Sequence, residues 1–199
     1  MNQEELNQKL IEHAKEGKLD LVKFLVEKGT DIHVQDVYSL KYASCFGYLE
    51  LVQYLVEQGA DIHTENNCAL RWATENNHLD VVKYLVEKGA DIHVLDDYPL
   101  NYASSQGNLE MVKFLVEKGA NIYTDNDEAL KMASNHLEVL KYFLFDCQMK
   151  IKQETKDWLI GNKQYQTLQL IEKRDLLFKL NQEIIQKDSF DNLGKKSKI

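Results

Sequence analysis

Three histidines at equal spacing are the side chains in this sequence that look most capable of chemistry. His33, His63 and His93 stand 30 residues apart, each after an Asp-Ile pair. Three imidazoles can hold a zinc ion when each nitrogen lies about 2 Å from the metal. Equivalent side chains on stacked helical units stand about 8–10 Å apart, which is too far to share one ion. We therefore interpret the histidines as part of the scaffold and predict no metal site.

The cysteines and serines do not indicate catalysis either. Cys45, Cys68 and Cys147 are scattered without a Cys-x-x-Cys pair, so the pattern favours reduced thiols over a zinc site or a disulfide framework. A nucleophilic site needs a Ser or Cys beside a His and a third orienting group, and no such set is evident. We predict a protein that is not an enzyme, has no catalytic residues and no cofactor, and resides in the cytoplasm, with the nucleus as the alternative.

The net negative charge of the chain disfavours some classes of binding partner. The chain of 199 residues has a formal net charge of −8 and a pI near 5.3. Nucleic-acid binding and adsorption to anionic membranes both rest on clustered Lys and Arg. The N-terminus does not resemble a signal peptide, and no run of about 18 apolar residues predicts a membrane span. We therefore expect a protein partner, and neither a nucleic acid nor a membrane.

An internal repeat in the sequence predicts the helices and loops that carry the histidines and cysteines. The decapeptide "LVEKGADIHV" at 85–94 has near-copies at 25–34, 55–64 and 115–124. The apolar residues before each copy follow helical spacing, an acid stands in the first turn, and a glycine follows the last turn. A shorter helix is predicted before it, at 39–47, 69–77 and 99–107. Such helix pairs bury their apolar faces by stacking, so the sequence predicts an all-α solenoid.

The repeat resembles the ankyrin repeat over roughly residues 6–150. The segments "YPLNYAS" (98–104), "GNLEMVKFLVEKGANI" (107–122) and "GADIH" (89–93) follow the family pattern in order. The resemblance implies an ankyrin-repeat solenoid, a right-handed stack of L-shaped units whose concave face is built from the first helices and the loops. Repeats of this length also resemble those that giant DNA viruses of amoebae encode in many copies.

Two departures from the family pattern concern the loops. The period is 30 residues, whereas the family period is commonly 33, so we expect shortened loops that need not contain paired strands. The family's His before the first-helix alanines is replaced as well. The hydrogen bond that normally ties neighbouring loops must then be made otherwise or be absent. The replacements are Lys41, Arg71, Asn101 and Lys131.

The predicted organisation is one stack with helical caps. A polar N-terminal capping repeat precedes three regular repeats and a fourth, degenerate one, which a helical cap and a disordered tail follow. The boundaries are 1–36 for the capping repeat, 37–66, 67–96 and 97–126 for the regular repeats, 127–150 for the degenerate repeat, 151–185 for the C-terminal cap, and 186–199 for the tail.

The resemblance implies a non-enzymatic adaptor, expected to be a monomer, that binds a partner protein through the concave face and the loops. The alternatives are a structural or self-assembling array, and a substrate-recruiting adaptor whose C-terminal helical segment binds a partner.

The column of Tyr42, Trp72, Tyr102 and Met132 is expected to pack between repeats. Positions that vary between repeats are the candidates for binding, with Tyr38, Phe46 and Tyr98 as aromatic anchors. The full set is Tyr38, Cys45, Phe46, Glu75, Asn76, Asp97, Tyr98, Ser105 and Gln106.

Overall fold

The computed structural model describes residues 2–30, 32 and 36–196, and these residues form helices without a strand. His33 therefore lies outside the described residues. The chain divides into two compact units, Met1–Val139 and Leu140–Ile199. The α-helices confirm the predicted all-α fold. They are α1 (Gln3–Lys15), α2 (Leu19–Glu27), α3 (Asp36–Cys45), α4 (Leu49–Glu57), α5 (Thr64–Glu75), α6 (Leu79–Glu87), α7 (Val94–Ser105), α8 (Leu109–Glu117), α9 (Thr124–Met132), α10 (Leu137–Lys141), α11 (Gln153–Gly161) and α12 (Tyr165–Lys196), with the short η2 (Ala133–Asn135) and η3 (Tyr142–Asp146).

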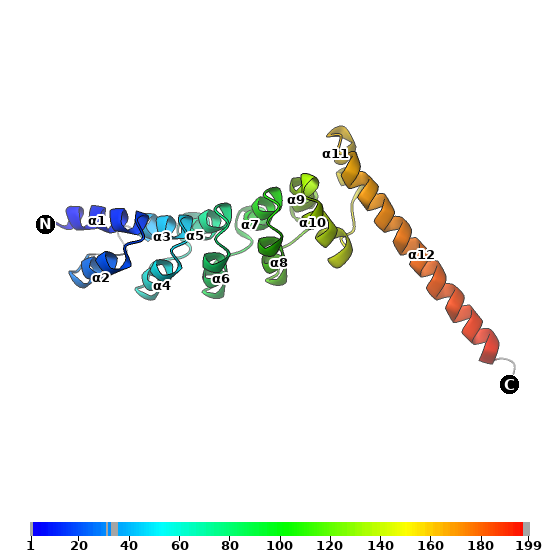
Figure 1. Ribbon diagram of the computed structural model, residues 1–199, viewed down its shortest axis with the longest axis horizontal. Helices are drawn as coiled ribbons and strands as arrows, with labels where there is room; N and C mark the ends of the chain where they lie inside the picture. Colours follow the sequence, from blue (N-terminus) through cyan, green and yellow to red (C-terminus); the bar gives the residue numbers. More distant parts are fainter. Residues whose placement is uncertain (1, 31, 33–35, 197–199) are drawn as a thin grey trace. The chain divides into compact units, whose positions relative to one another are not determined.

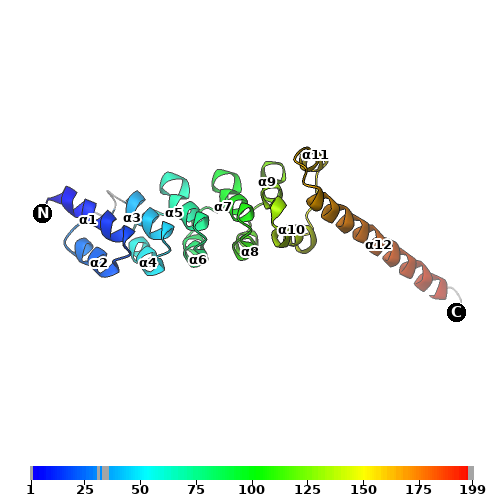
Figure 2. The same ribbon diagram turned by 45° about the horizontal axis from the view of Figure 1, so that its top comes forward.

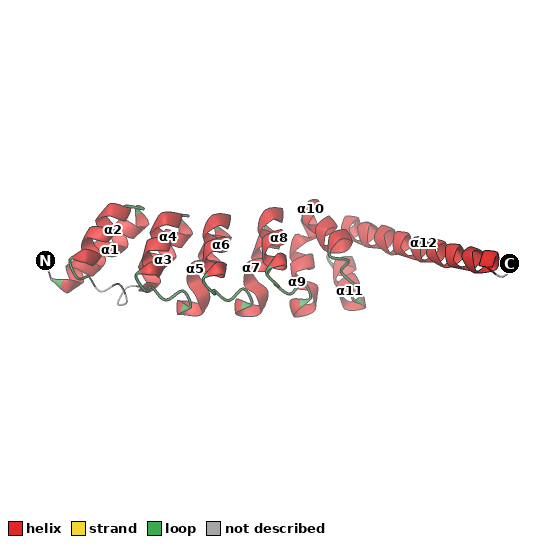
Figure 3. Ribbon diagram, turned by 90° about the horizontal axis from the view of Figure 1, so that it is seen from below, coloured by secondary structure: helices red, strands yellow, loops and turns green. Residues whose placement is uncertain are grey.

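The first unit is a stack of antiparallel helix pairs in two rows. Helices α1, α3, α5, α7 and α9 form one row, and each contacts the next (Figure 1). Helices α2, α4, α6 and α8 form the second row, and each contacts its own first-row partner (Figure 2). Figure 3 shows the same pairs from below, with short loops joining each pair to the next. This arrangement confirms the predicted solenoid of stacked helix pairs.

The second-row helices owe their position to one apolar stripe. On α4, Leu51, Val52 and Leu55 are fully buried, as the helical spacing predicts. The glycine after each helix adopts a left-handed conformation, for example φ +98° at Gly89, where a side chain would be strained. The chain then turns back, and the amide of Ala90 donates to the carbonyl oxygen of Leu85 at 2.9 Å. These features end the helix where the repeated sequence predicts.

The turn between the two helices of a pair is sized by a side chain from the following repeat. The imidazole of His78 covers Gly47, where an added Cβ would stand 2.3 Å from Nδ1, and its Nε2 lies 3.0 Å from the carbonyl oxygen of Cys45. His136 covers Gly107 in the same way, with Nε2 2.7 Å from the carbonyl oxygen of Ser105. A turn that is covered by an aromatic ring of the next repeat therefore requires glycine at this position. At the turn between α5 and α6, both partners differ: Asn77 stands at the glycine position, and Asn108 of the following repeat stands at the position of the histidine ring.

The shortened loops take a conformation that the sequence did not predict. In each of the three loops before α5, α7 and α9, three consecutive residues have left-handed backbone angles, with φ between 45° and 64°. Such residues cost about 1–2 kcal/mol each, less for Asn and Asp. The turn replaces the paired strands of longer repeats and confirms that the loops are short. The triplets are Glu65-Asn66-Asn67, Leu95-Asp96-Asp97 and Asp125-Asn126-Asp127.

The second unit contains η3, α11 and the long helix α12. Its core includes Phe143, Leu144, Leu159 and Ile171, all fully buried. Two helices occupy the segment predicted as a helical cap. Helix α12 continues to Lys196, and the disordered tail from residue 186 stays a prediction. The segment is polar but contains no proline to end the helix. Among the described helices, none is both long and apolar enough to cross a membrane.

The fit of His78 over Gly47 predicts a compensating pair of substitutions. Gly47→Ala adds a Cβ at φ +73° against the His78 ring, so we expect a loss of about 1–3 kcal/mol in the free energy of unfolding, measured by urea denaturation. The same substitution should cost clearly less in a His78→Asn background, which copies the native pair of Asn77 and Asn108. Strictly additive effects in this double-mutant cycle would contradict the proposed fit.

Candidate functional site

The candidate binding residues lie mainly on the exposed side of α3, α5 and α7. We call this surface the first-helix face. Tyr38 and Phe46 on α3 and its C-terminal turn expose 47% and 49% of their surface. They are the most exposed aromatic side chains of the face. Its members are Tyr38, Lys41, Tyr42, Cys45, Phe46, Arg71, Trp72, Glu75, Asn76, Tyr98, Asn101, Tyr102, Ser105 and Gln106, of which Asn76 and Gln106 are also exposed and the rest are half-buried.

Cations and aromatic rings alternate along this face. The Lys15 ammonium lies 4.3 Å from the centroid of the Tyr42 ring, and the Lys41 ammonium lies 4.9 Å from the Trp72 ring. In each pair the cation comes from one helix and the ring from the next. Such contacts contribute about 0.5–1 kcal/mol at exposed sites. The rings are therefore held in place by the preceding repeat.

The column of Tyr42, Trp72, Tyr102 and Met132 was predicted to pack in the core between repeats, but the structure buries its three rings only in part and leaves Met132 exposed. The positions on either side of the column are the buried ones, for example Leu40 and Ala43. The column therefore belongs to the first-helix face rather than to the core.

Tyr98 and Glu75 form a polar link between α5 and α7. The Tyr98 hydroxyl donates to Oε1 of Glu75 at 2.8 Å, and the Tyr98 ring stacks on Tyr102 with centroids 5.8 Å apart. Burial, and then the neighbouring Glu75 carboxylate, raise the pKa of Tyr98 to about 12. The hydroxyl therefore remains a hydrogen-bond donor at neutral pH, and two candidates from different repeats are fixed against each other.

Asp97 is placed inside the scaffold, not on the binding face. Only 4% of it is exposed. Its carboxylate accepts hydrogen bonds from the Asn121 amide at 2.9 Å and the Thr124 hydroxyl at 2.6 Å, both in the next loop. Asn67 makes the equivalent bond to the Asp91 amide at 2.9 Å. These contacts tie neighbouring loops together. The hydrogen bond between loops that the family histidine normally makes is therefore replaced by bonds to Asn67 and Asp97.

Arg71 and Asn101, which occupy the position of the family histidine, form hydrogen bonds to the loop of their own repeat. Arg71 donates from Nη2 to the carbonyl oxygen of Glu65 at 3.0 Å and from Nε to that of Asn66 at 3.1 Å. Asn101 donates to the carbonyl oxygen of Asp96 at 3.0 Å. Both side chains thus satisfy carbonyl groups that the left-handed turn leaves without helical partners.

The loop histidines have structural partners. Nδ1 of His63 lies 3.3 Å from Oδ1 of Asn67, and Nδ1 of His93 lies 2.9 Å from Oδ1 of Asp97. In each loop the imidazole contacts the polar side chain that reaches the next repeat. In the described part of the chain, no three His, Cys, Asp or Glu side chains are grouped to hold a metal ion.

Cys45 and Ser105 occupy equivalent positions beside the column. Burial raises the pKa of the Cys45 thiol, and the Asn76 amide donates to its sulfur at 3.5 Å. The protonated form of a thiol is a weak nucleophile. The Ser105 hydroxyl donates to the carbonyl oxygen of Tyr102 at 2.7 Å and accepts from Gln106. Both groups therefore already have hydrogen-bond partners within the stack.

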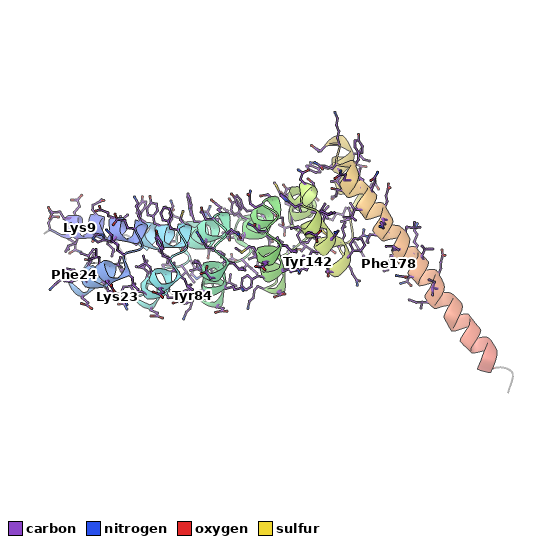
Figure 4. The ribbon with its side chains drawn as sticks, in the orientation of Figure 1. Lys9, Lys23, Phe24, Tyr84, Tyr142 and Phe178 are labelled. Carbon is purple, nitrogen blue, oxygen red and sulfur yellow. The ribbon has the colours of Figure 1, made fainter. Side chains whose placement is uncertain are left out.

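The second-row helices carry aromatic residues of their own. Lys23 lies 5.5 Å from the Tyr54 ring, and Lys83 lies 5.8 Å from the Phe114 ring. Figure 4 labels Lys23, Phe24 and Tyr84 on this row. Phe114 is buried, and burial raises the pKa of Tyr84. This row therefore exposes less aromatic surface in its central repeats than the first-helix face.

Sequence reasoning missed Lys15, Lys41 and Arg71 as parts of the face. The signal that could have found them is the adjacent pair of cation and ring in Lys41-Tyr42 and Arg71-Trp72. Equivalent helix positions lie side by side in a stack of repeats, so a cation beside a ring position lies near a ring of the next repeat.

Comparison with known proteins agrees with this geometry. A family model described as ankyrin repeats, in three copies, matches residues 10–96 and 90–157. These two matches span most of the chain, including every helix of the first unit except the start of α1. No curated protein matches the sequence.

The link between Tyr98 and Glu75 predicts a measurable titration. Glu75→Gln removes the carboxylate that helps to raise the Tyr98 pKa, so Tyr98 should titrate at a lower pH than in the parent. NMR of chains with labelled tyrosine rings measures this, and Glu110→Gln, on the exposed side of α8, is the control. Because a raised tyrosine pKa stabilises the fold below pH 10 and the effect fades toward pH 12, the parent should lose more stability than the variant over that window. An unchanged Tyr98 titration would contradict the link.

Proposed function

Because the chain belongs to the ankyrin-repeat family, we propose that it is a non-enzymatic adaptor that binds a partner protein through its first-helix face. Ankyrin repeats generally serve as protein–protein interaction modules. The proposal for this chain is carried by one observation: the face exposes Tyr38 and Phe46 and presents a half-exposed aromatic ring from each of α3, α5 and α7.

The chemistry of the face supports this proposal. Tyrosine, tryptophan and arginine dominate the energy of protein interfaces, and Tyr42, Trp72 and Arg71 stand together here. The rings are already restrained by the cations of the preceding helix, so little conformational entropy remains to be lost on binding. A preorganised row of rings is what a tight protein interface requires.

The charge of the face favours a partner with a mixed surface. The whole chain is acidic, but Lys15, Lys41 and Arg71 form a cationic line along the first helices. Glu75, the acid beside them, is already engaged by Tyr98. A partner segment with apolar anchors and some carboxylates would complement both the rings and this line.

Self-assembly through the end of the stack is the first alternative. Leu21 on α2 is 43% exposed, whereas Leu51, at the same repeat position, is 1% exposed because another helix pair covers it. Phe24 beside it is exposed as well. An added repeat from another molecule could cover both. Lys9, however, stands where Ser39 is buried, and a long charged side chain there disfavours continued stacking.

The second alternative assigns partner recruitment to the C-terminal helical segment. Its basis is the set of exposed apolar side chains on α12, such as Leu180 and Ile184. Under that alternative, substitutions on the first-helix face would leave partner capture unchanged, so the same variants test both functions.

The adaptor proposal predicts selective loss of binding. A ligand is first selected from a displayed peptide library with the full chain as bait, and its affinity is then titrated. Phe46→Ala and Tyr38→Ala should each weaken binding by about 1–3 kcal/mol, because both remove exposed anchors. Leu55→Ala should instead lower the free energy of unfolding by about 2–5 kcal/mol, because it removes a buried side chain.

The matched control for these variants is Lys83→Glu on the second row. It should bind like the parent, since Lys83 lies on α6 and outside the face. If Lys83→Glu abolishes binding while both alanine variants bind normally, the partner uses the second-row surface and the assignment of the face is wrong.

A further inference from the structure

Helix α12 carries large apolar side chains that its own unit does not cover. Within the second unit it packs mainly against α11 and η3. Residues of its central part remain open to solvent; Leu180 is 45% exposed and Ile184 is 56% exposed. Single exposed apolar residues are ordinary, but a contiguous set marks an interaction surface. The set comprises Leu176, Leu177, Phe178, Leu180, Ile184 and Ile185.

These side chains occupy one broad side of the helix. Leu177, Leu180 and Ile184 recur at intervals of three and four residues, which places them in one stripe. At 3.6 residues per turn, Lys179 lies on the opposite side of the helix and Glu183 lies at the edge of the apolar side. The helix is therefore amphipathic over residues 176–185, and its apolar side lacks a covering element within its own unit.

A hollow of about 650 Å³ adjoins the stripe. Leu177 and Phe178 of α12 form one wall, and Leu144, Phe145 and Ile151 line the other (Figure 4, where Phe178 is labelled). The surface of the second unit thus has a depression near residue 178 and projecting isoleucines two turns further along the same helix.

We propose that the apolar side of α12 pairs with α12 of a second copy of this chain to form a closed, antiparallel dimer. A two-fold axis near Leu180 and Asn181 brings Ile184 of each copy opposite Leu177 of the other. Each hollow then receives the projecting isoleucines of the partner copy. The same surface of each chain therefore supplies both the hollow and the projecting isoleucines, as a self-complementary two-fold interface requires.

The composition of the helix favours a second copy over a lipid surface. Helices that lie on anionic membranes carry an excess of Lys and Arg on the polar side. The charged residues here are of both signs, as Glu172, Lys179 and Glu183 show. Two copies also shield the same stripe in one step, because every apolar residue buried on one helix buries its counterpart on the other.

This pairing replaces the monomer expected from the sequence and does not depend on the first-helix face. A closed dimer would carry two copies of that face. If the adaptor function also holds, a partner with two binding segments would gain affinity through linkage without any new contact.

Sedimentation of the full chain tests the pairing directly. Between about 1 and 100 μM, a range that brackets a micromolar Kd, the mass should rise to twice the 23.2 kDa of one chain and then stay constant. A monomer throughout this range would overturn the proposal. Mass that keeps growing without a plateau would overturn it as well, because it would indicate an open array through the repeat ends.

Substitutions on α12 locate the interface. Leu180→Glu and Ile184→Glu each put a charge into the stripe and should raise the dimer Kd at least about tenfold. Lys179→Glu introduces the same side chain on the charged side and should dimerise like the parent. Circular dichroism must show equal helicity for all three. If both stripe variants dimerise normally, or if Lys179→Glu disrupts the dimer equally, α12 is not the interface.

The antiparallel direction has its own measurement. In chains whose free Cys45, Cys68 and Cys147 are replaced by alanine, Leu177→Cys is introduced into one chain and Ile184→Cys into another that carries a size tag, and the two are mixed and oxidised. The proposed axis brings residue 177 of one copy to residue 184 of the other, so mixed disulfides should form in preference to disulfides between like chains. Disulfides only between like chains would overturn the antiparallel arrangement.

Discussion

The structure depends above all on the inability of one helix pair to bury its own apolar stripe. Leu51, Val52 and Leu55 are fully buried only because α4 lies between its neighbours, whereas Leu21 at the end of the row is partly exposed. Every repeat therefore stabilises the next, and the free energy of folding accumulates along the stack rather than around one centre. This constraint explains why the apolar positions are copied from repeat to repeat while the surface positions vary.

Two smaller interactions adapt the stack to a short repeat. The left-handed turns shorten each loop, and Asn67 and Asp97 tie each turn to the backbone of the next loop. The rings of His78 and His136 close over glycines of the preceding repeat. In both cases a side chain of one repeat is fitted to the backbone of another, so a change at either partner affects the junction between repeats as well as the repeat itself.

The same arrangement places rings and cations at regular intervals on the first-helix face. Lys15 and Lys41 each cover a ring of the following first-row helix, which links the three helices α1, α3 and α5 into one continuous surface. The loops contribute mainly to stability, since the buried Asp97 accepts hydrogen bonds from Asn121 and Thr124 of the next loop. Tyr38 and Phe46 can therefore vary without altering the stack, because neither side chain is buried in it.

The sequence by itself determined the helix pairs, their order and the shortened loops, because apolar spacing and glycine positions are local properties of the chain. It also indicated a structural role for His63 and His93. Only the tertiary structure decided that Asp97 is buried, that the rings of Tyr42, Trp72 and Tyr102 are only partly buried, and that α12 continues to Lys196 and has exposed apolar side chains at 176–185. These outcomes depend on which element lies next to a residue, and a periodic sequence does not specify which side of a helix its neighbour covers.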